Sequence, residues 1–123
     1  MRKALLSVLL IFAVSGPAVA GPFEDGQAAH ARGDYATALS LWRPLAEQGH
    51  AFAQTNLGVM YARGQGVIQD NVYAYMWGNI SASNGNEIGG KLRDMVARKM
   101  TPAQIADAQK LTRECIRKKY KGC

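Results

Sequence analysis

The feature that most restricts how this chain can fold is an internal repeat with a spacing of 36 residues. Residues 34–49 align with residues 70–85 without a gap. The positions identical in the two copies are Asp34 and Asp70, Ala38 and Ala74, Ala46 and Ala82, and Gly49 and Gly85. Repeated units of this size bury their apolar faces only against their neighbours. The repeat therefore predicts a stack of similar units.

Each unit is predicted to be a pair of helices. Apolar residues recur at helical spacing over about residues 51–63, and they are Ala53, Leu57, Met60 and Tyr61. Gly58 leaves no side chain beside Leu57, so we expect the backbone of a neighbouring helix to come close there.

The break after this helix is predicted to be the turn between the two helices of one repeat. Gly64 and Gly66 readily adopt the positive φ angles that end a helix, and Asp70 is a good N-cap for the next helix. We expect the aromatic residues on either side of the turn to pack against one another. A phosphate-binding loop is disfavoured, because the third glycine of a dinucleotide loop and the Gly-Lys-Ser/Thr ending of a nucleotide loop are both absent.

Further helices are predicted on both sides of this unit. Residues 23–32 and 35–48 form a shorter first pair, in which Pro44 predicts a kink or an early stop. Downstream there is another apolar stripe, made of Ile88, Leu92, Met95, Val96 and Met100.

The last predicted helix has a well-defined start. Thr101 caps it, Pro102 fits its first turn, and Gln104 completes a capping box. Its inward-facing residues are predicted to be Ile105, Ala108, Leu111 or Thr112, Cys115 and Ile116. Because no segment alternates long enough to form a strand, the predicted fold class is all-α.

Three segments, 53–61, 64–70 and 74–77, resemble Sel-1-like repeats, a tetratricopeptide-related solenoid family. The family pattern is met almost completely over residues 51–85. The matching positions are Ala53, Leu57, Gly58, Tyr61, Gly64, Gly66, Val67, Asp70, Ala74 and Trp77. Residues 34–49 resemble the second helix of a preceding unit with a truncated first helix, whereas residues 87–123 depart from the pattern.

The resemblance implies a short α-solenoid that serves as a protein-binding scaffold, of a type often found in exported bacterial proteins. It divides the chain into a partial first repeat (21–49), a full repeat (50–86) and C-terminal capping helices (87–123). The expected partner is a protein or peptide, and no cofactor is expected.

Residues 1–20 have the layout of a secretory signal peptide. Arg2 and Lys3 precede an apolar run, and an Ala-Val-Ala cleavage site ends at Ala20. The apolar run is shorter than the roughly 20 residues that span a bilayer, so a membrane anchor is disfavoured. We expect the mature chain to begin at Gly21, to lack a transmembrane anchor, and to be periplasmic or secreted.

Cys115 and Cys123 both remain in the mature chain, and an even number of cysteines in an exported protein favours a disulfide. Gly122 gives the tail the freedom to fold back and bring Cys123 beside Cys115. The alternatives are free thiols or a redox pair, but the spacing of the two cysteines is unlike that of a Cys-x-x-Cys redox motif.

No residue pattern supports catalysis or a metal site. His30 and His50 are the only histidines, and no Cys/His cluster accompanies them, so we expect surface or capping roles. Ser40, Ser81 and Ser83 lack the Gly-x-Ser-x-Gly context of a hydrolase. Aromatic residues at helical spacing are expected to be core residues rather than the lining of a ligand groove. They are Trp42, Trp77, Tyr61, Tyr73 and Tyr75.

Two surfaces are candidate binding sites. The first lies opposite Leu57 on its helix and consists of Phe52, Thr55, Val59 and Arg63. Two alternatives are open for this surface: the next unit packs over it, or it remains exposed and binds a partner. The second is a basic cluster of Arg117, Lys118, Lys119 and Lys121 within residues 91–123, which carry a net charge of +7 against −3 for residues 21–90. It either docks an acidic partner or anionic surface, or only solubilises this end.

The leading hypothesis is an exported, non-enzymatic interaction module that holds a protein or peptide in the bacterial envelope. One alternative is a small exported enzyme, or an enzyme accessory, acting on cell-envelope polymer. The other is a basic protein that binds an anionic envelope component. Export disfavours nucleic acid as a partner.

Overall fold

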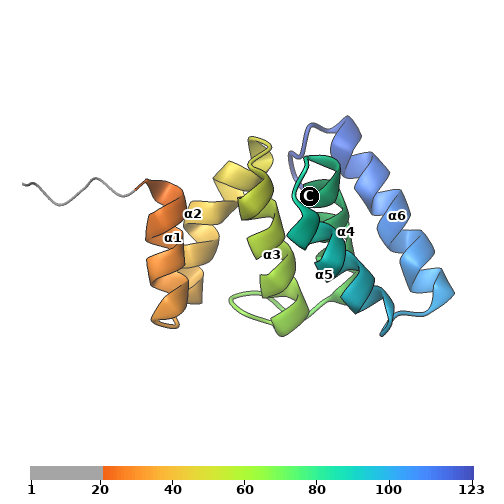
Figure 1. Cartoon of the computed structure of the whole chain (residues 1–123), viewed down its shortest axis with the longest axis horizontal. Coiled ribbons are helices and arrows are strands. Elements are labelled where there is room, and N and C mark those ends of the chain that lie inside the picture. Colours follow the sequence, from red (N-terminus) through yellow and green to blue (C-terminus); the bar gives the residue numbers. More distant parts are fainter. Residues whose placement is uncertain (1–20) are drawn as a thin grey trace, which may run out of the picture.

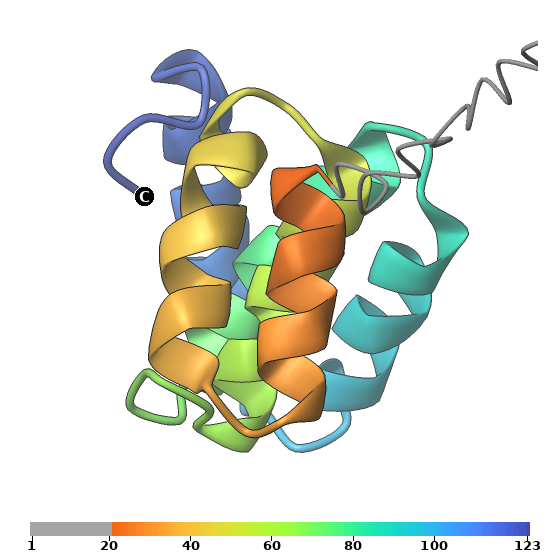
Figure 2. The same cartoon turned by 90° about the vertical axis from the view of Figure 1, so that its left-hand side faces the viewer.

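The computed structural model describes residues 21–123, which form six helices and no strand. The helices are α1 (Pro22–Ala31), α2 (Tyr35–Glu47), α3 (Ala51–Arg63), α4 (Asn71–Ser83), α5 (Glu87–Ala97) and α6 (Pro102–Arg117). They follow one another along a row from α1 to α6 (Figure 1), with alternate helices on opposite sides of it (Figure 2). The predicted all-α solenoid class is confirmed. The signal peptide predicted for residues 1–20 lies outside the described residues.

Each helix packs on its neighbour in the chain up to α5, and α6 then packs on α4 rather than along α5. As a result α5 and α6 lie on opposite sides of the row (Figure 2). Helices α1, α3 and α5 share the face nearest the viewer in Figure 1, where α3 and α5 run in the same direction. The division of the chain into a partial repeat, a full repeat and a cap stays a prediction.

The turn between α3 and α4 has the predicted conformation. Gly64 and Gly66 have φ angles of 67° and 72°. The Asp70 carboxylate accepts hydrogen bonds from the backbone N–H groups of Val72 (2.8 Å) and Tyr73 (3.2 Å), which caps α4. The rings of Tyr61 and Tyr73 stack across the turn with their centroids 5.3 Å apart. The break in the apolar run is therefore a helix hairpin, as predicted.

Neighbouring helices pack closely against several of the glycines. A Cβ atom on Gly58 would lie 2.7 Å from the Leu92 side chain and 3.2 Å from the Ala74 carbonyl oxygen. The expected close contact at Gly58 is confirmed. Trp42 and Trp77 are buried, in keeping with a core role for the large aromatic residues.

The predictions about α2, α5 and α6 hold only in part. Of the kink or early stop predicted at Pro44, the early stop was wrong, because α2 continues to Glu47. Within the stripe of α5, Leu92 and Val96 are buried but Ile88 and Met95 are exposed. Ile116, predicted to face inward, is also exposed. Because α6 packs on α4, it leaves one side of α5 open and turns Ile116 toward solvent.

The end of α6 and the C-terminal tail fold back on the rest of the molecule. Thr101 and Gln104 form the predicted capping box at the start of α6. Cys115 and Cys123 form a disulfide, with Cα atoms 5.7 Å apart. Between the cysteines, the Tyr120 hydroxyl donates a hydrogen bond to Asn84 Oδ1 (3.2 Å). The tail therefore connects α6 to the loop that follows α4.

Candidate binding face

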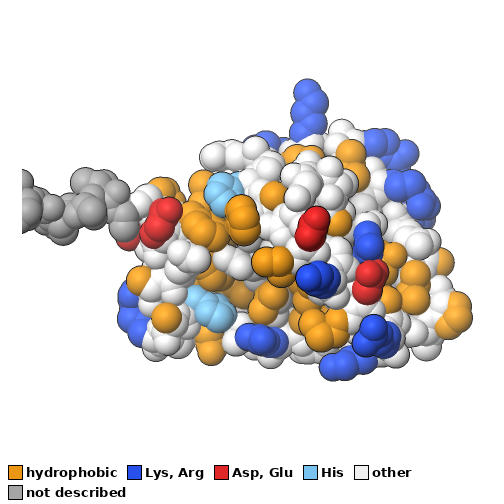
Figure 3. Space-filling model, viewed as in Figure 1, with side chains coloured by type: hydrophobic (Ala, Val, Ile, Leu, Met, Phe, Trp, Pro, Cys, Tyr) orange, Lys and Arg blue, Asp and Glu red, His pale blue; other side chains and the backbone are white. Residues whose placement is uncertain are grey.

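The surface formed by α1, α3 and α5, which we call the first-helix face, carries several uncovered apolar and aromatic side chains. Its members are Phe23, His30, Phe52, Asn56, Val59, Arg63, Ile88 and Met95. Phe52, Ile88 and Met95 are 58%, 58% and 54% exposed, respectively. Figure 3 shows apolar side chains over this side of the molecule. These three apolar side chains are therefore not part of the core and remain accessible on the surface.

Aromatic rings gather at the N-terminal end of this face. The Phe23 ring stacks on His50 with a centroid separation of 4.9 Å and lies 6.2 Å from the Phe52 ring. His50 Nδ1 also accepts a hydrogen bond from the Ala53 N–H (3.1 Å), so His50 caps α3. A capping role was one of those expected for the histidines.

His30 lies in a shallow hollow between α1, α2 and α3. The hollow has a volume of about 260 Å³ and is lined by Gln27, His30, Trp42, Asn56 and Val59. His30 Nε2 is 2.8 Å from Gln65 Oε1, which ties α1 to the turn after α3. The indole N–H of Trp42 donates to the Phe23 carbonyl oxygen (3.1 Å). The polar groups here hold neighbouring helices together.

Two further hollows lie between α3 and α5. The first is near the N-terminal ends of these helices, has a volume of about 270 Å³, and is lined by Ala51, Phe52, Asn84, Gly85, Asn86, Glu87 and Ile88. The second, which we call the α3–α5 hollow, has a volume of about 200 Å³. It is lined by Val59, Ala62, Arg63, Asn71, Leu92, Met95, Val96 and Lys99.

The four predicted residues of α3 do not form one exposed patch. Phe52 and Arg63 are exposed and Val59 is partly covered, but Thr55 is only 5% exposed. The Thr55 hydroxyl lies 2.6 Å from the Ser81 hydroxyl, which donates to the Ala51 carbonyl oxygen (2.8 Å). Of the two alternatives for this surface, Thr55 is covered rather than open, because α4 packs over this side of α3.

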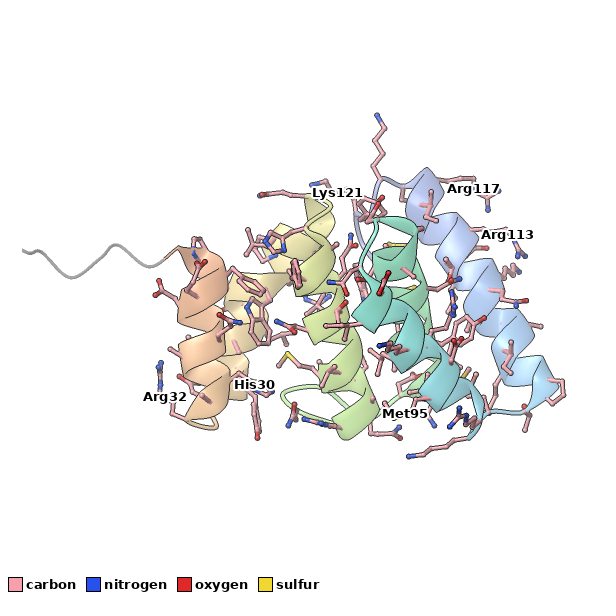
Figure 4. The ribbon with its side chains drawn as sticks, in the orientation of Figure 1. His30, Arg32, Met95, Arg113, Arg117 and Lys121 are labelled. Carbon is pink, nitrogen blue, oxygen red and sulfur yellow. A yellow bond between two sulfur atoms is a disulfide. The ribbon has the colours of Figure 1, made fainter. Side chains whose placement is uncertain are left out.

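The predicted basic cluster lies at the end of α6 and in the tail that folds back after it. Its four residues, Arg117, Lys118, Lys119 and Lys121, are all exposed. Arg113 and Arg117 project outward from α6 in Figure 4. Between residues 21 and 123 the ion pairs are Arg32–Asp34 and Arg93–Asp94, so none of the four cations is paired with a carboxylate. Folding leaves this charge available to solvent.

Within residues 21–123, one carboxyl group has a pKa clearly shifted by its surroundings. That group belongs to Asp34, the N-cap of α2. Hydrogen bonds from Thr37 lower its pKa, which is a structural effect. Residues 21–123 contain no group of three or more metal-ligating side chains. None of their helices is long and apolar enough to cross a membrane.

Sequence reasoning identified Phe52, Val59 and Arg63 but missed Phe23, Ile88 and Met95 as members of the exposed face. The apolar periodicity of residues 88–100 correctly indicated a helix. It could not show which part of the stripe would be covered, because that depends on where α6 packs.

Fold and surface together define a helical-repeat protein with an open face of apolar side chains. The family model described as Sel1 repeat matches residues 23–50 and 51–86, more than half of the chain. The protein belongs to the Sel1 repeat family.

Two relatives support this assignment. The crystal structure of c5321, a protective antigen present in uropathogenic Escherichia coli strains and displaying an SLR fold, superposes with a TM-score of 0.74. The match is 34% identical and covers 80% of this chain and 22% of that chain. NMB1327 of Neisseria meningitidis serogroup B, an uncharacterized protein, is 59% identical over 34 residues, which are 28% of this chain and 7% of its own length. This chain therefore spans a small part of each relative.

Proposed function

We propose that this protein is an exported, non-enzymatic interaction module of the bacterial envelope that holds a protein or peptide on its first-helix face. Sel1 repeats form a scaffold typical of protein interaction, which supports the class of function. The Cys115–Cys123 disulfide supports export, because structural disulfides persist in oxidising compartments.

The observation that carries the proposal is the exposure of Phe52, Ile88 and Met95 on two neighbouring helices, beside shallow hollows. Large apolar side chains that gather on one face, with polar residues around them, are typical of a protein-binding surface. The alternative, an enzyme acting on envelope polymer, would need a nucleophile and a base held together beside these hollows.

Site-specific photo-crosslinking in cells tests this proposal. A photoreactive phenylalanine derivative would replace Phe52 in one variant and Ile68 in the control. Ile68 is a matched control because it is 90% exposed but lies in the turn between α3 and α4, away from the face. We expect a discrete protein adduct from position 52 that position 68 does not give. Identical adducts at both positions, or none, would contradict a binding role for this face.

A second proposed site is the basic C-terminal end, which would hold an anionic envelope component. It is supported by four exposed cations without ion-pair partners, on a segment fixed by the disulfide. Attraction through exposed charge weakens as ionic strength rises.

Co-sedimentation with lipid vesicles tests this second site. We expect binding to vesicles containing phosphatidylglycerol, loss of binding as salt is raised, and little binding to neutral phosphatidylcholine. A variant with Arg117→Gln and Lys118→Gln should bind less, whereas Arg32→Gln with Arg98→Gln, which removes the same charge from exposed positions just after α1 and α5, should not. Equal losses in both variants would show attraction to net charge rather than to a site.

A further inference from the structure

The α3–α5 hollow differs from the other two hollows of the first-helix face in its charge. Its apolar lining comes from both helices and includes Val59, Leu92 and Met95. Its charged lining residues are Arg63 and Lys99, and both are cations. By contrast, the hollow at the other end of α3 and α5 is lined by the carboxylate of Glu87 and by no cation.

The two cations have no carboxylate partner among the described residues. The nearest acidic residues in sequence to this region are engaged elsewhere. Asp94 pairs with Arg93, with 3.0 Å between Arg93 Nε and Asp94 Oδ1. Asp70 accepts the backbone hydrogen bonds that cap α4. The hollow therefore combines an apolar lining with uncompensated positive charge.

Met95 gives the hollow an adaptable wall. It lies on α5, toward the end of that helix that faces the end of α3 (Figures 1 and 4). Its side chain is 54% exposed, whereas Leu92 and Val96 beneath it are buried. A methionine side chain is unbranched and flexible, so it can close over apolar groups of different shapes.

We propose that the α3–α5 hollow binds an acidic peptide segment. An apolar side chain of that segment fills the hollow against Val59 and Met95, and an adjacent carboxylate pairs with Arg63 and Lys99. An arginine can bind a carboxylate through two parallel hydrogen bonds, and the lysine adds a second positive charge. This inference rests on the proposed function and adds the chemistry of the partner to it.

Arg63 and Lys99 could also serve only to stabilise the helices. The experiment must distinguish this structural role from peptide binding. Arg63 ends α3 and Lys99 follows α5 by two residues, and cations near helix C-termini stabilise the helix dipole. A structural role predicts that replacing them lowers stability without changing which peptides bind. A binding role predicts a change in peptide preference.

Selection from a displayed library of random 12-residue peptides tests the proposal. Residues 21–123 serve as bait, beside a variant carrying Arg63→Gln and Lys99→Gln. A control variant carries Lys110→Gln and Arg113→Gln, which remove the same charge from exposed positions of α6. We expect peptides that pair Asp or Glu with a large apolar residue, about tenfold weaker binding to the first variant, and unchanged binding to the control. Met95→Gln should weaken binding by a similar factor.

Three results would overturn the proposal: enrichment of neutral or basic peptides, equal binding by all variants, or no enrichment at all. If the crosslink from position 52 appears while peptide binding does not depend on Arg63 and Lys99, the binding face stands and this inference fails. Enriched peptides synthesised with a C-terminal acid or amide identify the source of the carboxylate. Loss of binding in the amide form indicates the chain terminus, and retention indicates a side chain.

Discussion

At the scale of single residues, two adjacent glycines in α5 have opposite surroundings. A Cβ atom on Gly89 would lie 2.6 Å from the Ser81 Cβ and 2.8 Å from the Gly78 carbonyl oxygen. A Cβ atom on Gly90 would lie 3.6 Å from the Ala82 Cβ, which is an ordinary contact. The helices α4 and α5 can therefore pack this closely only if position 89 has no side chain.

We predict that Gly89→Ala lowers the free energy of unfolding by about 1–3 kcal/mol, because backbone atoms of α4 must move away. Gly90→Ala should be neutral or raise stability by up to about 1 kcal/mol, because alanine favours the helix. Urea denaturation of the two variants measures both effects. Equal effects of the two substitutions would contradict the close contact between α4 and α5.

Asp34 gives a prediction about pH. Its pKa is lowered from the ordinary value of 3.8 by hydrogen bonds from Thr37. The charged carboxylate therefore stabilises the fold above about pH 4, and this contribution is lost as the pH falls through the lowered pKa. We expect the stability advantage of the wild type over Asp34→Asn to shrink in acid. Urea denaturation of both proteins between pH 3 and 7 measures it, and a constant difference would contradict a charge effect.

At the scale of helices, the sequence predicted the hairpins more reliably than the packing between them. Asp70 and Thr101 predicted where α4 and α6 begin, because an N-cap depends only on residues a few positions apart in the sequence. The exposure of Met95 and the burial of Thr55 could not be predicted from neighbouring residues in the sequence. Both depend on which helix covers them, and that contact joins residues distant in sequence. The candidate site was therefore only partly predicted.

The contact between α6 and the tail leads to a prediction about the disulfide. Closing the short loop between Cys115 and Cys123 is expected to contribute about 2.5 kcal/mol by restricting the unfolded chain. Reduction should therefore lower the melting temperature, and the variant with both cysteines replaced by serine should match the reduced protein without responding to reductant. A wild type whose melting temperature is the same with and without reductant would contradict a stabilising role for the bond.

At the scale of the whole molecule, the core consists of two clusters that share helices. One runs from Ala29 in α1 through Trp42 and Trp77 to Cys115 in α6, and Tyr120 and Cys123 of the tail pack against it. The other joins α4, α5 and α6 through residues such as Tyr75 and Leu92. Because α4 and α6 contribute to both clusters, neither cluster can come apart without disturbing the other.

We therefore predict one cooperative unfolding transition rather than repeat-by-repeat unfolding. Tryptophan fluorescence reports only on α2 and α4, since Trp42 and Trp77 are the only tryptophans, whereas far-ultraviolet circular dichroism reports on all helices. In urea the two signals should give the same midpoint. A Trp42→Phe variant, which leaves Trp77 as the probe, should keep that agreement. Separate midpoints would mean that helices without a tryptophan unfold independently of α2 and α4, and that the two clusters do not form one cooperative unit.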